Sequence, residues 1–422
     1  MCSTCGRRLT AQRAFRGAAV AVTRGRLTRG RRGSPAFGRS ACARLRGIVS
    51  WCIRTLAGAR AQSAEGARLA GLLGGVLAAA GADAAELPED RADTMFHLYD
   101  GGGVTALGPA VLIRKSLFDR FSLSGSYYVD MVSNASIDVV TTASPYHETR
   151  KEAGLGLDYV YHDSSISLSG THSKEPDYSA DSASLDVSQD VFGGMTTVSV
   201  GYTRGWDTVG KYGSSLAAPA NHWQYRLGVT QVLTRRWLMS LNLESVSDDG
   251  YLQSPYRVAR VFGAAVPERD PSTRTGRAAL LRVAGDIGSR GAVRVQYRYF
   301  WDTWGIGAHT AELGYSRHWG DRWLVDGYVR YYRQDHALFY SDNFTRQMTY
   351  MSRNRQLSTF WDAGPGLKAS YSAGRIASRF DIKVTTAYQW MRFQYRDFSD
   401  IRTGKPYSFD ANVAEIFVSA TY

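Results

Sequence analysis

The amino-acid sequence predicts an all-β protein: a transmembrane antiparallel up-and-down barrel of about sixteen strands, within a range of about fourteen to eighteen. Three observations lead to this prediction. Apolar and polar side chains alternate along many short segments, short turns alternate with long loops between those segments, and the chain ends in an aromatic residue. We expect short turns on the periplasmic side of an outer membrane and long loops on the external side.

The alternation is clearest in the segment FSLSGSYYVDM, which places Phe121, Leu123 and Tyr127 on one face. Serines and Asp130 occupy the other face. Because successive side chains of a strand point to opposite sides, this pattern indicates a strand with lipid on one side and water on the other. The same alternation recurs at 223–230, 237–244, 293–302 and 380–390.

The connections favour a barrel over a soluble β-sandwich, whose strands would also alternate. Short links are expected near 115–119, 162–164, 191–194, 234–235, 288–290, 319–321 and 372–375. Longer links are expected near 133–149, 205–221, 248–275, 335–355 and 397–410, with brief external links near 101–103, 175–181 and 303–306. These seven turns and eight loops join sixteen strands and return both chain ends to the periplasm.

The carboxyl-terminal segment AEIFVSATY predicts the strand that closes the barrel. Ile416, Val418 and the terminal Tyr422 share one face, while Glu415 and Ser419 share the other. A closing strand that ends in an aromatic residue resembles the signal read by the barrel-assembly machinery. The alternative is an ordinary edge strand, but such an edge at the chain terminus would be poorly tied down.

The net charge of +13 suggests an anionic partner, but the charge is unevenly distributed. Residues 1–84 contain fifteen of the 51 Lys and Arg residues and only two acids, so the rest of the chain has 36 basic and 36 acidic residues. We therefore expect no nucleic-acid partner. After residue 84 no apolar run approaches the ~20 residues of a membrane helix, which excludes a helical membrane protein.

The chain divides into three predicted parts. Residues 1–60 are rich in Arg, and we interpret them as lying upstream of the true translation start. The alternative is that Cys2 and Cys5 form half of a metal or redox site, but a second close cysteine pair is missing from the sequence. Residues 61–84 read as a signal peptide cleaved after Ala84, and 85–422 as the barrel.

The predicted lumen contains many charged side chains. Arg294 and Arg298, with Arg282 on the neighbouring strand, are expected to form a basic ladder that selects solutes by charge. The alternative is that these charges are solvated or paired with one another. The acids assigned to the lumen are Asp130, Glu152, Asp158, Asp186, Asp190, Glu244, Asp302, Glu312, Asp326, Asp362 and Asp381, and the other bases are Arg226, Arg330, Lys368 and Lys383.

The search for catalytic and cofactor motifs yields little. Two pairs in external loops, His147 with Glu148 and Asp335 with His336, have the composition of an Asp-His dyad in a hydrolase. We find no phosphate-binding glycine loop and no haem-attachment motif, so no cofactor or metal is expected. The loop 248–275 is expected to fold over or into the mouth of the barrel. The aromatics Phe339, Tyr340, Phe344 and Tyr350 of the loop 335–356 are expected to bind a ligand or partner, or to cap the rim.

Several stretches resemble an uncharacterised family of predicted outer-membrane barrel proteins known only as a domain of unknown function. They include VLIRKSLFDRFSLSGSYYVDMVSNASIDVV, ASPYHETR, LDVSQDVFGGMTTVSVGYTRGWD, GYLQSPYR, YRYFWDTWGIGAHTAELGYSR, FYSDNF and RNRQLSTF. The resemblance spans about 94–422 and implies fold and location, but no reaction. It also hints that relatives occur together with a periplasmic flavin-attaching enzyme, and hence that the family takes part in envelope electron transfer.

Three functions remain open from the sequence. The first is a pore or channel for small polar or ionic solutes, because a wide barrel without an exported plug leaves an open lumen. The second is a barrel scaffold for a periplasmic redox partner that carries flavin or haem, and the third is an outer-membrane hydrolase. Expected partners are outer-membrane lipid with lipopolysaccharide and the barrel-assembly machinery, and porin-sized barrels are often homotrimers.

Overall fold

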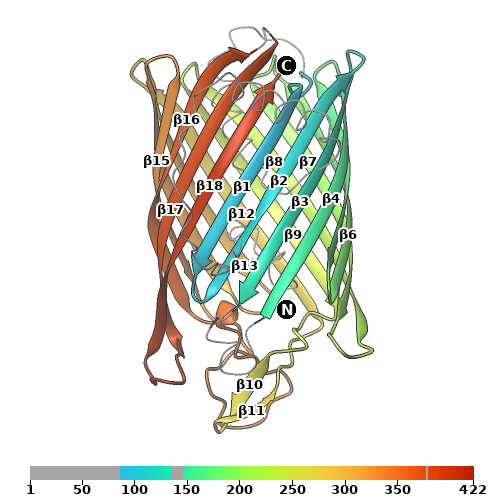
Figure 1. Cartoon of the computed structure of the whole chain (residues 1–422), viewed down its shortest axis with the longest axis vertical. Helices are drawn as coiled ribbons and strands as arrows, with labels where there is room; N and C mark the ends of the chain where they lie inside the picture. The colour runs from blue at the N-terminus through green and yellow to red at the C-terminus, as the bar shows by residue number, and fades with distance from the viewer. Residues whose placement is uncertain (1–85, 135, 137–145, 377–378) are drawn as a thin grey trace, which may run out of the picture.

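The computed structural model describes residues 86–134, 136, 146–376 and 379–422, and these form a closed antiparallel barrel of sixteen strands (Figure 1). The predicted fold class and strand count are confirmed. The first nine strands are β1 (Arg91–Gly101), β2 (Val104–Leu117), β3 (Phe121–Asn134), β4 (Tyr146–Tyr161), β5 (Ser164–Glu175), β6 (Tyr178–Val191), β7 (Thr196–Gly210), β8 (Ala217–Thr234) and β9 (Trp237–Gly250). The others are β12 (Thr273–Ile287), β13 (Gly291–Asp302), β14 (Gly307–Trp319), β15 (Trp323–Gln334), β16 (Phe360–Ile376), β17 (Phe380–Ser399) and β18 (Pro406–Thr421).

Each barrel strand pairs with its neighbour in the chain, and β1 pairs with β18 to close the sheet. The closing register runs from Arg91 opposite Thr421 to Gly101 opposite Ala411. Closure leaves the barrel with no exposed sheet edge, as a membrane-embedded sheet requires. In the part of the chain that the structure describes, no helix is long and apolar enough to cross a membrane.

The alternation of side chains between the two faces is confirmed. On β3, Leu123 is 46% exposed on the outer surface, whereas Ser124, which points inward, is 1% exposed. The same arrangement holds at the closing strand, where Ile416 and Val418 are exposed on the outside. An apolar outside and a polar inside are the reverse of a soluble protein and match a barrel surrounded by lipid.

The two ends of the barrel differ, and we call them the turn end and the loop end. The turn end carries the short links 118–120, 162–163, 192–195, 235–236, 288–290 and 320–322, and lies uppermost in Figure 1. The start of β1 and the end of β18 meet there. The loop end carries the links 251–272 and 335–359, of which the first contains the hairpin β10 (Val258–Val261) and β11 (Ala264–Pro267).

Several predicted links differ in extent, and the expected loop 397–410 covers only 400–405. The expected turn at 372–375 lies inside β16, which runs to Ile376. Its turn-forming residues are taken up by a β-bulge between Ser372 and Gly374, where the glycine has a φ of 83°. The expected loop 205–221 is shorter, because β7 reaches Gly210 and β8 starts at Ala217. Residues 1–85, with the predicted Arg-rich segment, its cysteines and the signal peptide, lie outside the described residues.

Candidate functional site: the lumen and its loop-end cap

The predicted basic ladder lies on β12 and β13 and points into the lumen. Arg294 is paired with two acids, Glu312 at 3.1 Å on β14 and Asp326 at 3.2 Å on β15. It reaches Asp326 across β14 because its neighbour there is Gly314, which has no side chain. A Cβ atom on Gly314 would lie 2.8 Å from Arg294 Nη2.

The other two members of the ladder have different partners. The Arg298 guanidinium lies 3.5 Å from the Glu244 carboxylate on β9. Arg282 Nε donates a hydrogen bond of 3.0 Å to the side-chain oxygen of Gln296. Two of the three predicted selectivity residues are therefore neutralised locally by acids, and their role in selectivity stays a prediction.

The arrangement at Gly314, where a long side chain crosses a strand above a glycine, recurs in the lumen. Arg226 on β8 reaches Asp186 on β6 at 2.8 Å across the intervening Gly201. Tyr328 on β15 lies over Gly366 and donates a hydrogen bond of 3.0 Å to Gln389 on β17. A glycine at an inward position of an alternating segment is the sequence signal for such a contact. The sequence analysis did not identify which side chains meet across these glycines.

Further ion pairs cross-link the inner wall. Arg330 pairs with Asp362, and Arg274 pairs with Asp302. Arg150, which we had not assigned to the lumen, pairs with Glu152. Most assigned lumen charges thus follow the alternative of mutual pairing, which keeps the interior polar.

The inner wall of β3–β8 carries small hydroxyl side chains, and we call it the hydroxyl wall. Cross-strand hydrogen bonds link Thr171 to Ser182 at 2.6 Å and Ser184 to Thr203 at 2.8 Å. Three serines of β3 also point inward, at positions 122, 124 and 126. These hydroxyl side chains extend only a short way from the wall, between the longer pairs Arg226–Asp186 and Arg150–Glu152 of the same strands.

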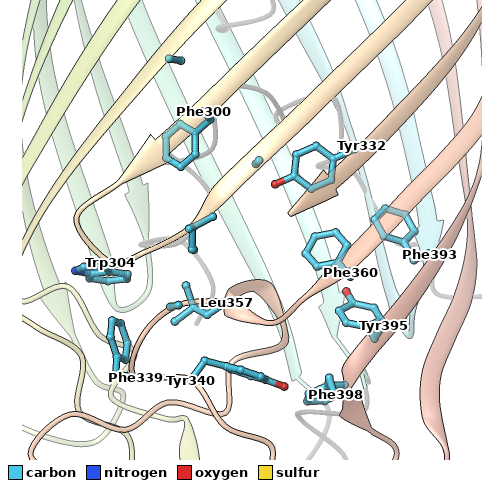
Figure 2. Packing of buried hydrophobic residues seen from close by; sticks show 14 of the residues in the cluster. Phe300, Trp304, Tyr332, Phe339, Tyr340, Leu357, Phe360, Phe393, Tyr395 and Phe398 are labelled. Atoms are coloured by element: carbon cyan, nitrogen blue, oxygen red, sulfur yellow. The ribbon is translucent and has the colours of Figure 1, made fainter. Parts of the chain in front are cut away.

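The opposite wall, β13–β18, carries a cluster of large apolar side chains at the loop end (Figure 2). The loop 335–359 contributes Phe339, Tyr340 and Leu357, which pack against inward-facing Phe360 and against Phe398 near the end of β17. Other members are Phe300, Trp304, Tyr332, Phe393 and Tyr395. Burial raises the pKa of Tyr340, so its hydroxyl stays protonated and donates a 2.9 Å hydrogen bond to the backbone oxygen of Asp397.

Two arginines attach this loop to its surroundings. The Arg353 guanidinium donates a 2.7 Å hydrogen bond to the backbone oxygen of Ser399 and lies 4.4 Å from the ring centroid of Phe398. The Arg355 guanidinium lies 5.5 Å from the ring centroid of Phe409 on β18. We call the loop 335–359 and its attachments the loop-end cap.

The loop 251–272 joins the cap. Phe344 N–H donates a 2.8 Å hydrogen bond to Arg260 O, and Met351 N–H donates a 2.9 Å bond to Arg269 O. The two long loops therefore fold together at the mouth of the barrel. Of the predicted cap aromatics, Phe339, Tyr340 and Phe344 are buried, while Tyr350 is 46% exposed.

The structure does not bring Asp335 and His336, the pair considered for a hydrolase, into contact as a dyad. His336 Nδ1 lies 3.2 Å from Asp397, while Asp335 contacts Arg333 at 3.5 Å. His147 and Glu148 are neighbours on one strand and therefore point to opposite faces. Sequence reasoning missed His222, whose two ring nitrogens contact Asp207 at 2.8 Å and Asp248 at 2.6 Å, linking β7, β8 and β9.

Three carboxylates form a candidate cation site. Among the described residues, Glu148, Glu175 and Asp177 have carboxylate oxygens within 4.8 Å of one another. They lie at the loop end of β4 and at the β5–β6 link. Such spacing is compatible with a hard cation such as Ca²⁺.

Sequence comparison connects the chain to a family. Residues 54–225 and 217–389 match the family described as "Protein of unknown function (DUF3570)". The chain belongs to this family. The resemblance that we drew from the sequence is confirmed, although the match begins earlier and ends earlier than the expected 94–422. No curated protein has a sequence that matches this DUF3570 chain.

Several solved structures match the chain at very low sequence identity. The siderophore receptor PirA from Pseudomonas aeruginosa is 9% identical, with a TM-score of 0.41, and the match covers 75% of this chain and 60% of that chain. The CymD monoaromatic hydrocarbon channel is 10% identical, with a TM-score of 0.39 and coverage of 80% and 89%. A bacterial polysaccharide outer membrane secretin is 8% identical, with a TM-score of 0.45 and coverage of 79% and 99%. The DUF3570 chain therefore spans less than two thirds of PirA.

Proposed function

We propose that this protein is an outer-membrane barrel that acts as a pore for small polar or ionic solutes. The turn end faces the periplasm and the loop end faces the exterior in this proposal, because single-chain barrels place short turns and both termini on the periplasmic side. The observation that supports it best is the hydroxyl wall inside a sixteen-stranded barrel. An eight-stranded barrel is just filled by its side chains, whereas barrels of sixteen strands leave an aqueous channel.

The position of the cap supports a route for the solute along one side of the lumen. In the circular strand order, the hydroxyl wall β3–β8 is directly opposite β13–β18. The large side chains and the inserted loop lie on β13–β18, and the small hydroxyls lie on β3–β8. Solutes would therefore pass along the hydroxyl wall, with hydroxyl groups replacing part of their water shell.

The inward cations give this route a proposed preference for anions. Arg282, Lys368 and Lys383 form no ion pair among the residues that the structure describes, whereas Arg294 and Arg298 are paired with acids. Lys368 on β16 and Lys383 on β17 face the hydroxyl wall across the lumen, and Arg282 lies on β12 at the border of this half. A transverse field of this kind selects solutes by charge and dipole.

Planar-bilayer recordings of the purified, folded protein test the proposal. We expect stepwise conductance that falls when Ser184→Trp, alone or with Ser169→Trp, narrows the hydroxyl wall. Ala183→Trp is the matched control, because Ala183 is the next residue of the same strand and faces the outside. A folded barrel without conductance would overturn the pore. If that silent barrel also co-purified with a periplasmic flavoprotein or cytochrome, the scaffold alternative would replace it.

A further inference from the structure

Two lysines on the outer surface are directly opposite each other. Lys151 on β4 pairs in register with Lys174 on β5. Both side chains are exposed, while their neighbours Glu152 and Ser173 are buried and point into the barrel. The strand alternation therefore directs both ammonium groups toward the surroundings of the barrel.

This arrangement lacks a counter-charge within the protein. Directly opposite residues of neighbouring strands have Cβ atoms about 5 Å apart, and like charges there are destabilising. Among the residues that the structure describes, neither lysine forms an ion pair or hydrogen bond. Nearby acids have other partners, because Glu152 pairs with Arg150 and Asp181 lies 2.7 Å from His172.

Arg204 is a second outward cation, and its guanidinium has partners within the protein. The Arg204 guanidinium lies 4.0 Å from the ring centroid of Trp223 and 5.1 Å from that of Trp206. It also donates a 2.7 Å hydrogen bond to the side-chain oxygen of Asn221. The contrast indicates that the lysine pair is arranged for an anion that comes from outside the chain.

The position of the two lysines along the barrel axis indicates which part of the membrane surrounds them. Toward the turn end, the outer surface of β4 presents Leu155, 67% exposed, and that of β5 presents Leu168, 54% exposed. These leucines belong to the apolar belt that contacts lipid chains. The lysines lie at the loop-end border of this belt, where apolar lipid meets headgroups.

We propose that Lys151 and Lys174 together bind a phosphate group of lipopolysaccharide in the external leaflet. The two ammonium groups would donate charge-assisted hydrogen bonds to phosphate oxygens, and the leucines below them would contact the acyl chains. The inference rests on the proposed outer-membrane location with the loop end outside. It does not depend on conduction, because the pair lies on the outer surface.

Binding of purified lipid A to the folded protein in detergent tests this site. We expect Lys151→Gln and Lys174→Gln each to weaken binding about fivefold, and the double variant about twenty-fivefold. The charge-preserving variant with Lys151→Arg and Lys174→Arg retains binding. Lys405→Gln is the matched control, because Lys405 is an exposed lysine in the β17–β18 link, away from the belt. Dephosphorylated lipid A should bind wild type as weakly as lipid A binds the double variant.

Three results would overturn the proposal. The first is equal binding of lipid A by wild type and the double variant, and the second is equal binding of phosphorylated and dephosphorylated lipid A. The third is a loss of binding to phosphatidylglycerol vesicles, in the double variant, that equals its loss of lipid A binding. That result would make the pair a general contact for anionic lipids. Heat-modifiable migration on a gel shows whether each variant is folded. If the double variant does not fold, lipid A binding by the two single variants tests the proposal. Conductance of the variants is recorded separately, so a failed pore and a failed lipid site are distinguishable.

Discussion

The Arg298 guanidinium on β13 lies 3.5 Å from the Glu244 carboxylate on β9, with the whole of β12 between the two strands. A charge pair that spans a strand holds the two side chains parallel to the wall rather than extended into the lumen. Removing either partner therefore lets the remaining group move and changes the net charge of the lumen. This coupling determines how the lumen should respond to mutation.

Replacing Arg294 and Arg298 by Ala should increase the permeability of cations relative to anions. The two substitutions leave Glu244, Glu312 and Asp326 without their arginine partners and so make the lumen more negative. Glu244→Gln should act in the opposite direction because it releases the Arg298 charge. Reversal potentials in a salt gradient measure both effects. Identical reversal potentials for the wild type and both variants would remove these residues from the selectivity mechanism.

Gly314→Ala should separate Arg294 from Asp326 with only a small loss of stability. The added Cβ atom would meet the flexible end of Arg294 at 2.8 Å, so the guanidinium can move away, at a cost of about 1 kcal/mol for a weakened ion pair. Gly364→Ala should be much worse, because its Cβ would lie 1.8 Å from the backbone oxygen of Trp390. The temperature at which the folded band on a gel is lost gives a melting temperature for each of the two variants. Equal melting temperatures would contradict this account of the lumen glycines.

The fold was predictable because its signal is local and repeated. Each strand carries its own alternation, and the turn residues between strands set the order of the sheet, so no knowledge of distant contacts was needed. The closing strand was predictable from Ile416, Val418 and Tyr422 for the same reason. The bulge at Gly374 was not, since a glycine between Ala373 and Arg375 looks the same in a turn and in a bulge.

The lumen contacts were much less predictable. Alternation places Arg294 inside the barrel, but its partner Asp326 is two strands away and is accessible only because Gly314 lies between them. Similarly, the sequence shows aromatic residues in the loop 335–359 but not that the loop packs on the inner wall beside Phe360. Such pairings depend on register and on which side chains are small, which no single segment encodes.

Arg353→Ala should loosen the loop-end cap. The substitution removes a buried guanidinium that bonds to the backbone oxygens of Asp342 and Ser399, at a cost of about 1–3 kcal/mol in local stability. Proteases should then cleave the loop 335–359 faster in the folded barrel, and channel currents should become noisier. Arg346→Ala is the control, because Arg346 is an exposed residue of the same loop. If both variants were cleaved at the wild-type rate, Arg353 would not hold the cap.

Paired cysteines test the closing register of the barrel. Met95 on β1 is directly opposite Phe417 on β18, and the described residues contain no cysteine that would compete. Met95→Cys with Phe417→Cys should form a disulfide under mild oxidation, which joins the two ends of the barrel into a ring. Met95→Cys with Val418→Cys should not, because Val418 faces the outside. Equal cross-linking of both pairs would contradict the register.

Replacement of Tyr422 separates a structural role from an assembly signal. Its N–H donates a 3.0 Å hydrogen bond to the backbone oxygen of Asp90, and its ring lies 5.6 Å from that of Phe380 and 5.0 Å from Lys115 Nζ. Tyr422→Phe retains the ring and the backbone contact, so we expect normal amounts in the outer membrane. Tyr422→Ala should reduce those amounts.

The reason for that reduction follows from refolding into detergent without any cellular machinery. If Tyr422→Ala refolds as well as wild type but reaches the membrane poorly, the assembly machinery reads the terminal aromatic ring. If refolding is impaired to the same degree, the ring acts by packing the end of β18 against Phe380 and Lys115. Undiminished amounts of Tyr422→Ala in the membrane would exclude both roles, and the closing signal would then have to lie in the outward side chains of Ile416 and Val418.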